Sequence, residues 1–380
     1  MKIRAVAALG LTAALALTAC GGDNTTGEDT AAPAEGEETP AGEETAEGEG
    51  NAAGGDLSGT LAGMGASSMR VAQEAWTSAF MDQNPDVQVT YAAEGSGAGR
   101  EGIQNGSVQF AGSDEAFSIE ENKAGAFKSC SADSAVYNLP VYISPIAVVF
   151  KLDGVDTLNM DPATIAGIFK GDIAKWNDPA IAELNPDATL PDEFITIIHR
   201  ADDSGTTENF TDYLSQTAGD VWDAEPDKKW PYEGGQGQQQ TDGVYNAVAS
   251  GNGTIGYVDA SAVKDDVSVV HVGTGDKFFA PDPEQAAAIV ENSPIEDGRA
   301  EGDLGIALNR EAEGYPIILV AYGIACAKYD DQATADMVKA YLTFITSEEG
   351  QNMAAEQAGS APLSAGLADQ VKASIESINA

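Results

Sequence analysis

Residues 195–207 read Ile-Thr-Ile-Ile-His-Arg-Ala-Asp-Asp-Ser-Gly-Thr-Thr, and this stretch decides the fold class. Its first four residues are β-branched, which predicts a short strand. The polar loop after them ends in Ser and Gly, just before a segment that carries Phe210, Tyr213 and Leu214 on one face, which predicts a helix. A strand, a polar loop and a helix, in that order, form the unit from which α/β sheets are built.

The same unit recurs along the chain. Its pattern predicts strands at 57–63, 87–91, 108–112, 254–258 and 316–325, a helix at 162–170, two C-terminal helices, and a helix whose apolar stripe is Ala72, Ala75, Trp76, Ala79 and Phe80. The apolar stretch 139–150 is interrupted by Pro140 and Pro145, so we expect two strands there, with a crossover between domains. These elements predict an α/β fold with mixed sheets flanked by helices.

Four loops at the expected strand ends are rich in Gly, Ser and Thr: Gly65–Ser68, Gly95–Gly99, Gly112–Asp114 and Arg200–Thr207. Ligands of open α/β sheets bind at the carboxyl ends of strands. Small residues let backbone N–H groups come close to a ligand, and a helix start adds unpaired donors and a partial positive charge. Each loop alone is explained as well by simple helix capping. Four of them in one chain favour an anion site.

The loop that starts at Arg200 is the most specific of the four. Arg200 offers two parallel, charge-assisted hydrogen bonds to a tetrahedral oxyanion, and Asp202 could hold the guanidinium in place. Ser204, Gly205 and Thr206 add two hydroxyls and a run of backbone donors. The alternative is a surface Arg–Asp pair beside a capped helix.

Asp114 has the wrong charge for an anion site unless the anion carries a proton. Phosphate near neutral pH has a hydroxyl to donate, whereas sulfate has none. A buried Asp114 that accepts this proton would therefore select phosphate and reject sulfate, because sulfate leaves the carboxylate desolvated and unpaired.

Other chemistries are poorly supported by the sequence. Residues 97–102 match the G-x-G-x-x-G dinucleotide pattern after a strand, but this is not the first strand–helix turn of the folded part. Only His199 and His271 are present, which is sparse for a zinc site or a Ser-His-Asp triad. We expect a binding protein rather than an enzyme, with no cofactor and no catalytic metal.

The N-terminus predicts export. Residues 1–19 combine Lys2 and Arg4 with a short apolar run, which is typical of a signal peptide. The segment Leu17-Thr18-Ala19-Cys20 resembles a bacterial lipobox, so Cys20 is expected to carry lipid; an ordinary signal peptide with an incidental cysteine is the alternative. The rest of 20–56 is acidic and of low complexity, as in a disordered tether, although a recognition role stays open.

Size, charge and cysteine content limit the number of domains, the kind of ligand and the state of the cysteines. Residues 57–380 exceed the usual size of one core, so two domains are expected. The net charge of -42 excludes the basic footprint of a nucleic-acid-binding protein. Cys130 and Cys326 form an even pair in an oxidising compartment, which favours a disulfide over two buried thiols.

These loops resemble those of the substrate-binding lipoprotein of the bacterial phosphate-specific ABC transporter, a member of the periplasmic phosphate-binding proteins. The resemblance covers nearly all of 57–380. It is carried by Leu61–Ser68, Gly95–Ser96, Phe110–Asp114, Lys175–Asp178, Arg200–Thr206 and Gly256–Val258. Two departures stand out, since the family often has Thr-Phe where this chain has Ser67-Ser68, and a second serine where this chain has Gly97.

The resemblance implies a role for each matching position. It makes phosphate ligands of Ser67, Ser68, Ser96, Asp114, Arg200, Ser204, Gly205 and Thr206, with Asp202 as the partner of Arg200. It also implies a two-lobed, periplasmic-binding-protein-like (class II) fold with two hinge-strand crossings, in which 57–143 and 318–380 form lobe one and 144–317 forms lobe two. Cys130 and Cys326 would then lie near the hinge side of lobe one.

The function implied is capture of inorganic phosphate at the outer face of the cytoplasmic membrane and its delivery to the permease subunits of an ABC importer. The protein would be a monomer held to the membrane by lipid on Cys20. The rivals are a receptor for sulfate, molybdate or an organic phosphate, a phosphate-ester hydrolase, and a purely structural surface lipoprotein.

Overall fold

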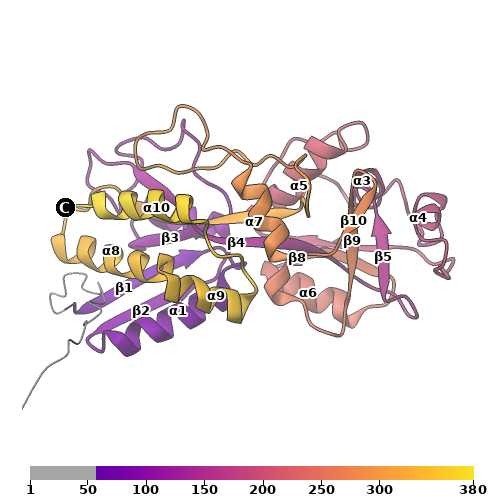
Figure 1. Ribbon diagram of the computed structural model, residues 1–380, viewed down its shortest axis with the longest axis horizontal. Coiled ribbons are helices and arrows are strands. Elements are labelled where there is room, and N and C mark those ends of the chain that lie inside the picture. The colour runs from indigo at the N-terminus through magenta and orange to yellow at the C-terminus, as the bar shows by residue number, and fades with distance from the viewer. Residues whose placement is uncertain (1–56) are drawn as a thin grey trace, which may run out of the picture. The chain divides into compact units, whose positions relative to one another are not determined.

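Alternating apolar strands and amphipathic helices assemble into a mixed α/β structure in the computed structural model, which describes residues 57–380 (Figure 1). The predicted signal peptide, Cys20 and the acidic tether lie outside the described residues.

The predicted strands and helices are found where the patterns place them, within a few residues at each end. The strands are β1 (Gly59–Gly65), β2 (Val87–Ala92), β3 (Phe110–Ser113), β4 (Val136–Lys151), β5 (Thr157–Met160), β6 (Thr196–Arg200), β7 (Gln236–Gln238), β8 (Thr254–Asp259), β9 (Ser268–Thr274), β10 (Lys277–Phe279) and β11 (Ile318–Cys326). The helices are α1 (Arg70–Gln83), α2 (Ser96–Asn105), α3 (Pro162–Lys170), α4 (Pro179–Leu184), α5 (Gly205–Thr217), α6 (Gln240–Ser250), the 3-10 turn η1 (Ala260–Ala262), α7 (Pro283–Glu291), α8 (Gln332–Thr346), α9 (Glu348–Ala358) and α10 (Ala365–Ser377).

The long strand β4 connects the two parts of the sheet. The strand order is β2-β1-β3-β11-β4-β8-β6-β7, with β9 beside β4 and joined in turn by β5 and β10. Residues 136–145 of β4 pair antiparallel with β11, and from Ile146 onward β4 pairs with β8 instead. The strands that precede the four predicted loops, β1, β2, β3 and β6, thus belong to one continuous hydrogen-bonded sheet.

The prediction of two strands within 139–150 is wrong, because β4 runs unbroken through both prolines. Proline interrupts a strand only where its missing N–H would be needed. Pro140 lies beside a register shift, where Val141 is the extra residue between the pairs Tyr142–Ala321 and Pro140–Tyr322. Pro145 lies where β4 changes partner from β11 to β8. Both prolines therefore occupy positions where the ladder is already irregular.

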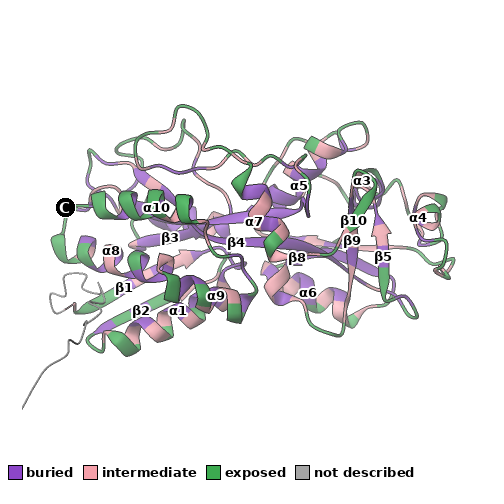
Figure 2. Ribbon diagram, in the orientation of Figure 1, coloured by how far each residue is buried: buried purple, intermediate pink, exposed green. Residues whose placement is uncertain are grey.

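Helices cover the sheet, with their apolar faces turned inward. Trp76 of α1 is fully buried, and its indole Nε1 donates to the Gly350 carbonyl of α9 at 2.7 Å. Figure 2 shows buried residues along the central strands and exposed residues on the outer sides of the helices. The chain closes with α8, α9 and α10, three helices rather than the two predicted, because Ser347 ends α8 and caps α9. Within 57–380, no helix has the length and apolar character that crossing a membrane requires.

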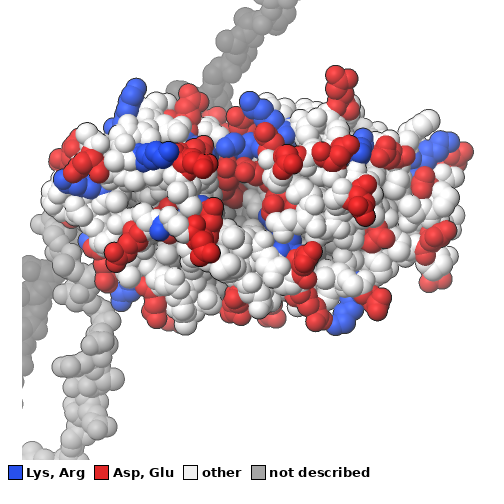
Figure 3. All heavy atoms as spheres, turned by 90° about the horizontal axis from the view of Figure 1, so that it is seen from above, with Lys and Arg blue, Asp and Glu red and all other residues white. Residues whose placement is uncertain are grey.

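The surface of the described residues is strongly acidic. Figure 3 shows Asp and Glu side chains spread over one face, with fewer Lys and Arg side chains scattered among them. Any anion that binds this protein must therefore be held by local groups rather than by the field of the whole molecule.

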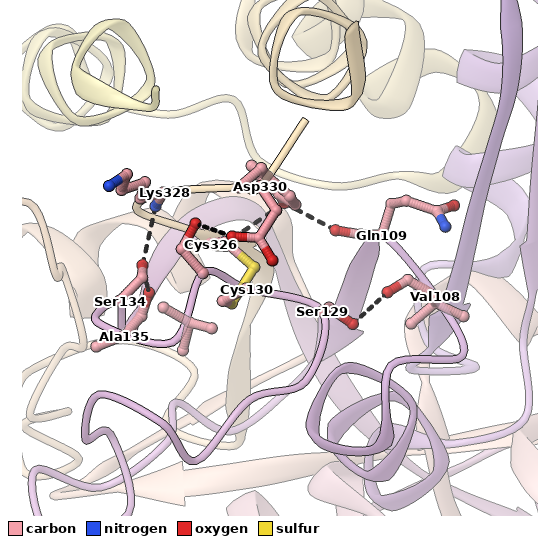
Figure 4. Close-up of a disulfide and its surroundings, with 12 residues drawn as sticks. Val108, Gln109, Ser129, Cys130, Ser134, Ala135, Cys326, Lys328 and Asp330 are labelled. Atoms are coloured by element: carbon pink, nitrogen blue, oxygen red, sulfur yellow. Dashed lines mark hydrogen bonds between the residues drawn. A yellow bond between two sulfur atoms is a disulfide. The ribbon is translucent and has the colours of Figure 1, made fainter. Parts of the chain in front are cut away.

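The predicted disulfide is confirmed. Cys130 and Cys326 are bonded, with their Cα atoms 5.3 Å apart, and the bridge joins the loop before β4 to the end of β11 (Figure 4). The hydroxyl of Ser129 donates to the Val108 carbonyl at 2.6 Å, and the Lys328 N–H donates to Ser134 Oγ at 2.9 Å. The bridge therefore lies in a hydrogen-bonded corner of the fold.

The expected position of the bridge near the hinge side is wrong. Cys326 lies opposite Val136, at the far end of the β4–β11 ladder from Pro145, where β4 changes partner. Residues 57–380 pack as one compact unit. The boundaries of the two lobes stay a prediction.

Replacing both Cys130 and Cys326 by Ser should lower the free energy of unfolding by about 2–5 kcal/mol, because the bridge closes a loop with a sequence separation of 196. Thermal unfolding with and without a reductant measures this. Reductant should lower the unfolding temperature of the unmodified protein but leave that of the double variant unchanged. Equal unfolding temperatures for the two proteins under oxidising conditions would contradict the prediction.

Candidate functional site

Asp114, just after β3, is the residue on which three of the predicted loops converge. Its side chain accepts a hydrogen bond at Oδ1 from the hydroxyl of Ser68 (2.5 Å) and one at Oδ2 from the hydroxyl of Thr206 (2.9 Å). Its backbone N–H donates to Ser96 Oγ at 3.1 Å. Asp114 is only 3% exposed. The structure thus brings Ser68, Ser96 and Thr206 together around one buried carboxylate.

Burial raises the pKa of Asp114, because the charged form is desolvated; the Ser68 and Thr206 hydroxyls and the charge of Arg200 oppose this rise. Because the carboxylate has lost its contacts with water, it accepts a hydrogen bond or a proton readily, inside a site that contains mostly hydrogen-bond donors.

Helix starts surround this carboxylate. The helix α2 begins at Ser96 and α5 begins at Gly205, with Ser204 as its N-cap, whose Oγ accepts from the Thr207 N–H at 3.2 Å. The first N–H groups of a helix have no partner within the helix, so they add donors and a partial positive charge near Asp114. The hydroxyl of Ser204 serves as the cap, and its proton stays free to donate.

Gly205 lets α5 approach the Asp114 loop. A Cβ at this position would lie 2.7 Å from both Asp114 Cβ and Ser96 Oγ, which is closer than real Cβ contacts. Gly97 plays the same part for the neighbouring loop, where a Cβ would lie 2.5 Å from Asp203 Cβ. The absence of a serine at position 97 therefore has a steric reason, since the Arg200 loop packs against this backbone.

The predicted pairing of Arg200 with Asp202 is confirmed. Arg200 Nε donates to Asp202 Oδ1 at 2.8 Å, and Nη2 contacts Oδ2 of the same carboxylate. Burial alone would raise the pKa of Asp202, but hydrogen bonds and charge from Arg200 lower it. Among residues 57–380, none of the hydrogen bonds uses Nη1 of Arg200. The guanidinium is thus held along one edge and has donor capacity left on the other.

The hydroxyl of Ser67 contacts a segment that the prediction did not include. Its Oγ lies 3.0 Å from Thr241 Oγ1 and accepts from the Thr241 N–H at 3.2 Å. The preceding residue, Gln240, has a left-handed backbone (φ 59°), and its N–H donates to Asp202 Oδ1 at 3.0 Å. The start of α6 therefore joins the site. The sequence reasoning missed it although Gly234, Gly235 and Gly237 precede it, because β7, the strand just before it, is only three residues long and was not predicted.

Two carboxyl groups lie beside the cradle, the group of hydrogen-bond donors formed by Ser68, Ser96, Arg200 and the start of α5. Burial and a hydrogen bond with Glu115 raise the pKa of Glu208 to about 9, against weaker opposition from Lys228 and Arg100. Within 57–380, Oε2 of a charged Glu208 would find no donor. A protonated Glu208 resolves this, since it donates to Glu115, whose Oε2 also accepts from Lys228 Nζ at 3.0 Å.

Comparison with known proteins identifies the class. A family model described as "PBP superfamily domain" matches residues 45–349, so the fold and the cradle define a periplasmic-binding-protein-like chain. Phosphate-binding protein PstS 3 of Mycobacterium leprae (strain TN) is 35% identical over 303 residues, 77% of this chain and 80% of its own length. Phosphate-binding protein PstS of Xylella fastidiosa (strain Temecula1 / ATCC 700964) is 31% identical over 326 residues, covering 82% and 84%. The chain belongs to the family of PstS phosphate-binding proteins.

Solved structures agree on the fold. The phosphate-binding protein of Stenotrophomonas maltophilia superposes with a TM-score of 0.69 at 21% identity, covering 83% of this chain and 94% of that one. A high-affinity periplasmic phosphate-binding protein, PfluDING, solved with bound phosphate at pH 8.5, gives a TM-score of 0.66 at 20% identity, with 83% and 93% covered. The predicted fold class is therefore confirmed. The named relatives are binding proteins.

Replacing Gly205 by Ala should destabilise the protein by roughly 1–3 kcal/mol, because the added methyl group forces α5 away from Asp114 and Ser96. The unfolding temperature measures this and should fall by several degrees. Gly366→Ala in α10 is the matched control, since a Cβ there meets nothing within 4 Å. Equal unfolding temperatures for the two variants would show that α5 does not press on the Asp114 loop.

Replacing Glu208 by Gln should change how stability depends on pH. The folded protein keeps the Glu208 proton up to about pH 9, and the unfolded chain releases it near the ordinary pKa of 4.5. The free energy of unfolding of the unmodified protein therefore falls as pH rises from about 4.5 to 9. Gln keeps the hydrogen bond to Glu115 and has no proton to lose.

The unfolding temperature of Glu208→Gln should match that of the unmodified protein near pH 4.5 and exceed it by several degrees near pH 9. The exposed Glu120→Gln is the control and should follow the unmodified protein throughout. If Glu208→Gln shows no gain at high pH, Glu208 is charged in the folded protein.

Proposed function

We propose that this protein captures inorganic phosphate outside the cytoplasmic membrane and delivers it to the permease of an ABC phosphate importer. The observation that carries the proposal is the buried carboxylate of Asp114 at the centre of a cradle made of hydroxyls, helix starts and Arg200. The relatives at 30–35% identity are phosphate-binding proteins, which supports the same ligand here.

The ligand-binding roles follow from donor chemistry. We assign the charged donor to Arg200, the uncharged donors to Ser67, Ser68, Ser96, Ser204, Gly205 and Thr206, and the positioning of the guanidinium to Asp202. Asp114 accepts the proton of the bound phosphate. Sulfate has no proton, so it would place an unpaired anion against a desolvated carboxylate.

The contacts between the two proposed lobes support delivery of bound phosphate to a permease. Loops from the proposed lobe one (Ser68, Ser96, Asp114) and lobe two (Gly205, Thr206) touch in this structure. A ligand that contacts both lobes only when they meet stabilises the closed state, which a permease can then recognise. The signal-peptide pattern and Cys20 support export and lipid anchoring at the outer face of the membrane, with a monomer as the working unit.

Isothermal titration calorimetry with phosphate and sulfate tests the proposal through Asp114→Asn. The unmodified protein should bind phosphate and ignore sulfate. Asn has no charge to leave unpaired and can donate to sulfate, so discrimination between the two ions should fall by about 10- to 100-fold.

Asp203→Asn is the matched control, because it removes the same charge from an exposed side chain near the site. It should bind phosphate as the unmodified protein does. Tighter binding of sulfate, molybdate or an organic phosphate by the unmodified protein would assign a different ligand. Turnover of p-nitrophenyl phosphate would overturn the binding-protein reading altogether.

A further inference from the structure

Asn209 in α5 forms a bridge that none of the proposed ligand-binding roles uses. Its Nδ2 donates to the backbone carbonyl of Asp114 at 2.7 Å and to that of Gly205 at 3.0 Å. Asn209 is 7% exposed. One amide thus fastens the loop that carries the carboxylate to the helix start that carries Thr206.

Arg310 fixes the direction of that amide. Its Nη2 donates to Asn209 Oδ1 at 2.7 Å. A guanidinium can only donate and a backbone carbonyl can only accept, so a flipped amide would put donor against donor and acceptor against acceptor. All the partners of Asn209 therefore require the same orientation, with Nδ2 toward Asp114.

Arg310 is itself held firmly. It is 1% exposed, its Nε donates to Asp212 Oδ2 at 2.5 Å, and its Nη1 donates to the carbonyls of Ile318 (3.0 Å) and Pro316 (3.3 Å). Ile318 begins β11 and lies opposite Pro145, where β4 changes partner. The chain of contacts thus runs from the strand crossing through Arg310 and Asn209 to the Asp114 loop.

The bridge borders a pocket on one side. A cavity of about 440 Å³ lies beside it, with Asp114, Asn209, Arg310, Val320 and Tyr322 in its wall. On this side the bridge is bordered by the pocket rather than by close-packed side chains, so its hydrogen bonds help to set the spacing of α5 and the Asp114 loop.

We infer that Asn209 and Arg310 act as a positioning pair, which holds the Asp114 loop against the start of α5 and so sets how long the anion stays bound. The inference rests on the proposed binding of phosphate at Asp114. Neither residue needs to touch the ligand. They act by keeping the acceptor of Asp114 and the donors of α5 at a fixed spacing, because binding energy is lost when a site must reorganise.

The test is a double-mutant cycle with Asn209→Ala, Arg310→Met and the combined variant, with inorganic phosphate as the ligand. Each single variant should bind about 5- to 30-fold more weakly, chiefly through faster dissociation in stopped-flow measurements. The combined variant should lose clearly less affinity than the sum of the two single losses, because Arg310 reaches the Asp114 loop through Asn209, although it also holds α5 at Asp212. Additive losses would overturn the inference, as would affinities within twofold of the unmodified protein.

Arg299→Met is the matched control. Arg299 lines the same cavity, its side chain is 5% exposed, and it pairs with Glu296 and Asp303 rather than with α5. The variant removes the same positive charge as Arg310→Met. Because Arg299 does not contact α5, its loss should leave the affinity for phosphate within twofold, even if it lowers the unfolding temperature. An equal loss of affinity in Arg299→Met would mean that charge, and not positioning, is responsible.

Hydrogen exchange of the ligand-free protein separates this inference from the proposed function. Asn209→Ala and Arg310→Met should speed exchange at the amides of residues 113–116 and in the first turn of α5, whereas Arg299→Met, which removes a donor to the Phe117 carbonyl, should leave the first turn of α5 unchanged. If the unmodified protein fails to bind phosphate, the proposed function falls, and these exchange rates still decide whether the pair positions the loop. Unchanged exchange in both variants would overturn the inference.

Discussion

A buried carboxylate without a basic partner of its own is the constraint around which this site is organised. Asp114 is removed from water, so each of its oxygens must accept a hydrogen bond. Ser68 supplies one and Thr206 the other, and these residues come from loops that are far apart in the sequence. Satisfying one side chain thus requires β1, β3 and α5 to meet at one point. The glycines at 97 and 205 make that meeting possible, because their backbones lie where a side chain would clash.

The acidity of the chain makes the local hydrogen-bond donors around Asp114 more important. With a net charge of -42, the molecule as a whole repels the anion that it is proposed to bind. Attraction must come from within a few ångströms, where helix starts, hydroxyls and one guanidinium act and distant charge is screened. Asp202 lies between Arg200 and the start of α6, so even the single strong cation of the cradle is partly neutralised. A site built this way depends more on the positions of its donors than on charge.

Local signals in the sequence were sufficient for the strands and helices next to the four loops, because periodicity and helix-start chemistry depend on near neighbours. The elements β5, β7, β9, β10, α4, α6 and α7 were not predicted. The pairing of Arg200 with Asp202 is of this kind, since the two residues lie two positions apart. Contacts between distant segments were beyond such signals. Thr241 follows the glycines at 234, 235 and 237, and Asn209 lies just after the Arg200 loop, but their partners are remote in the sequence, and the contacts form only when α5, α6 and the segment of Arg310 come together. The continuity of β4 was missed for a related reason, since whether a proline breaks a strand depends on the partner strand.

The bond between Cys130 and Cys326 has a consequence for how the protein responds to a cut in its backbone. The whole stretch that includes β6, α5 and the Arg200 loop lies between these two cysteines. A single cut in any surface turn of that stretch would therefore leave both fragments covalently attached and free to stay folded around each other.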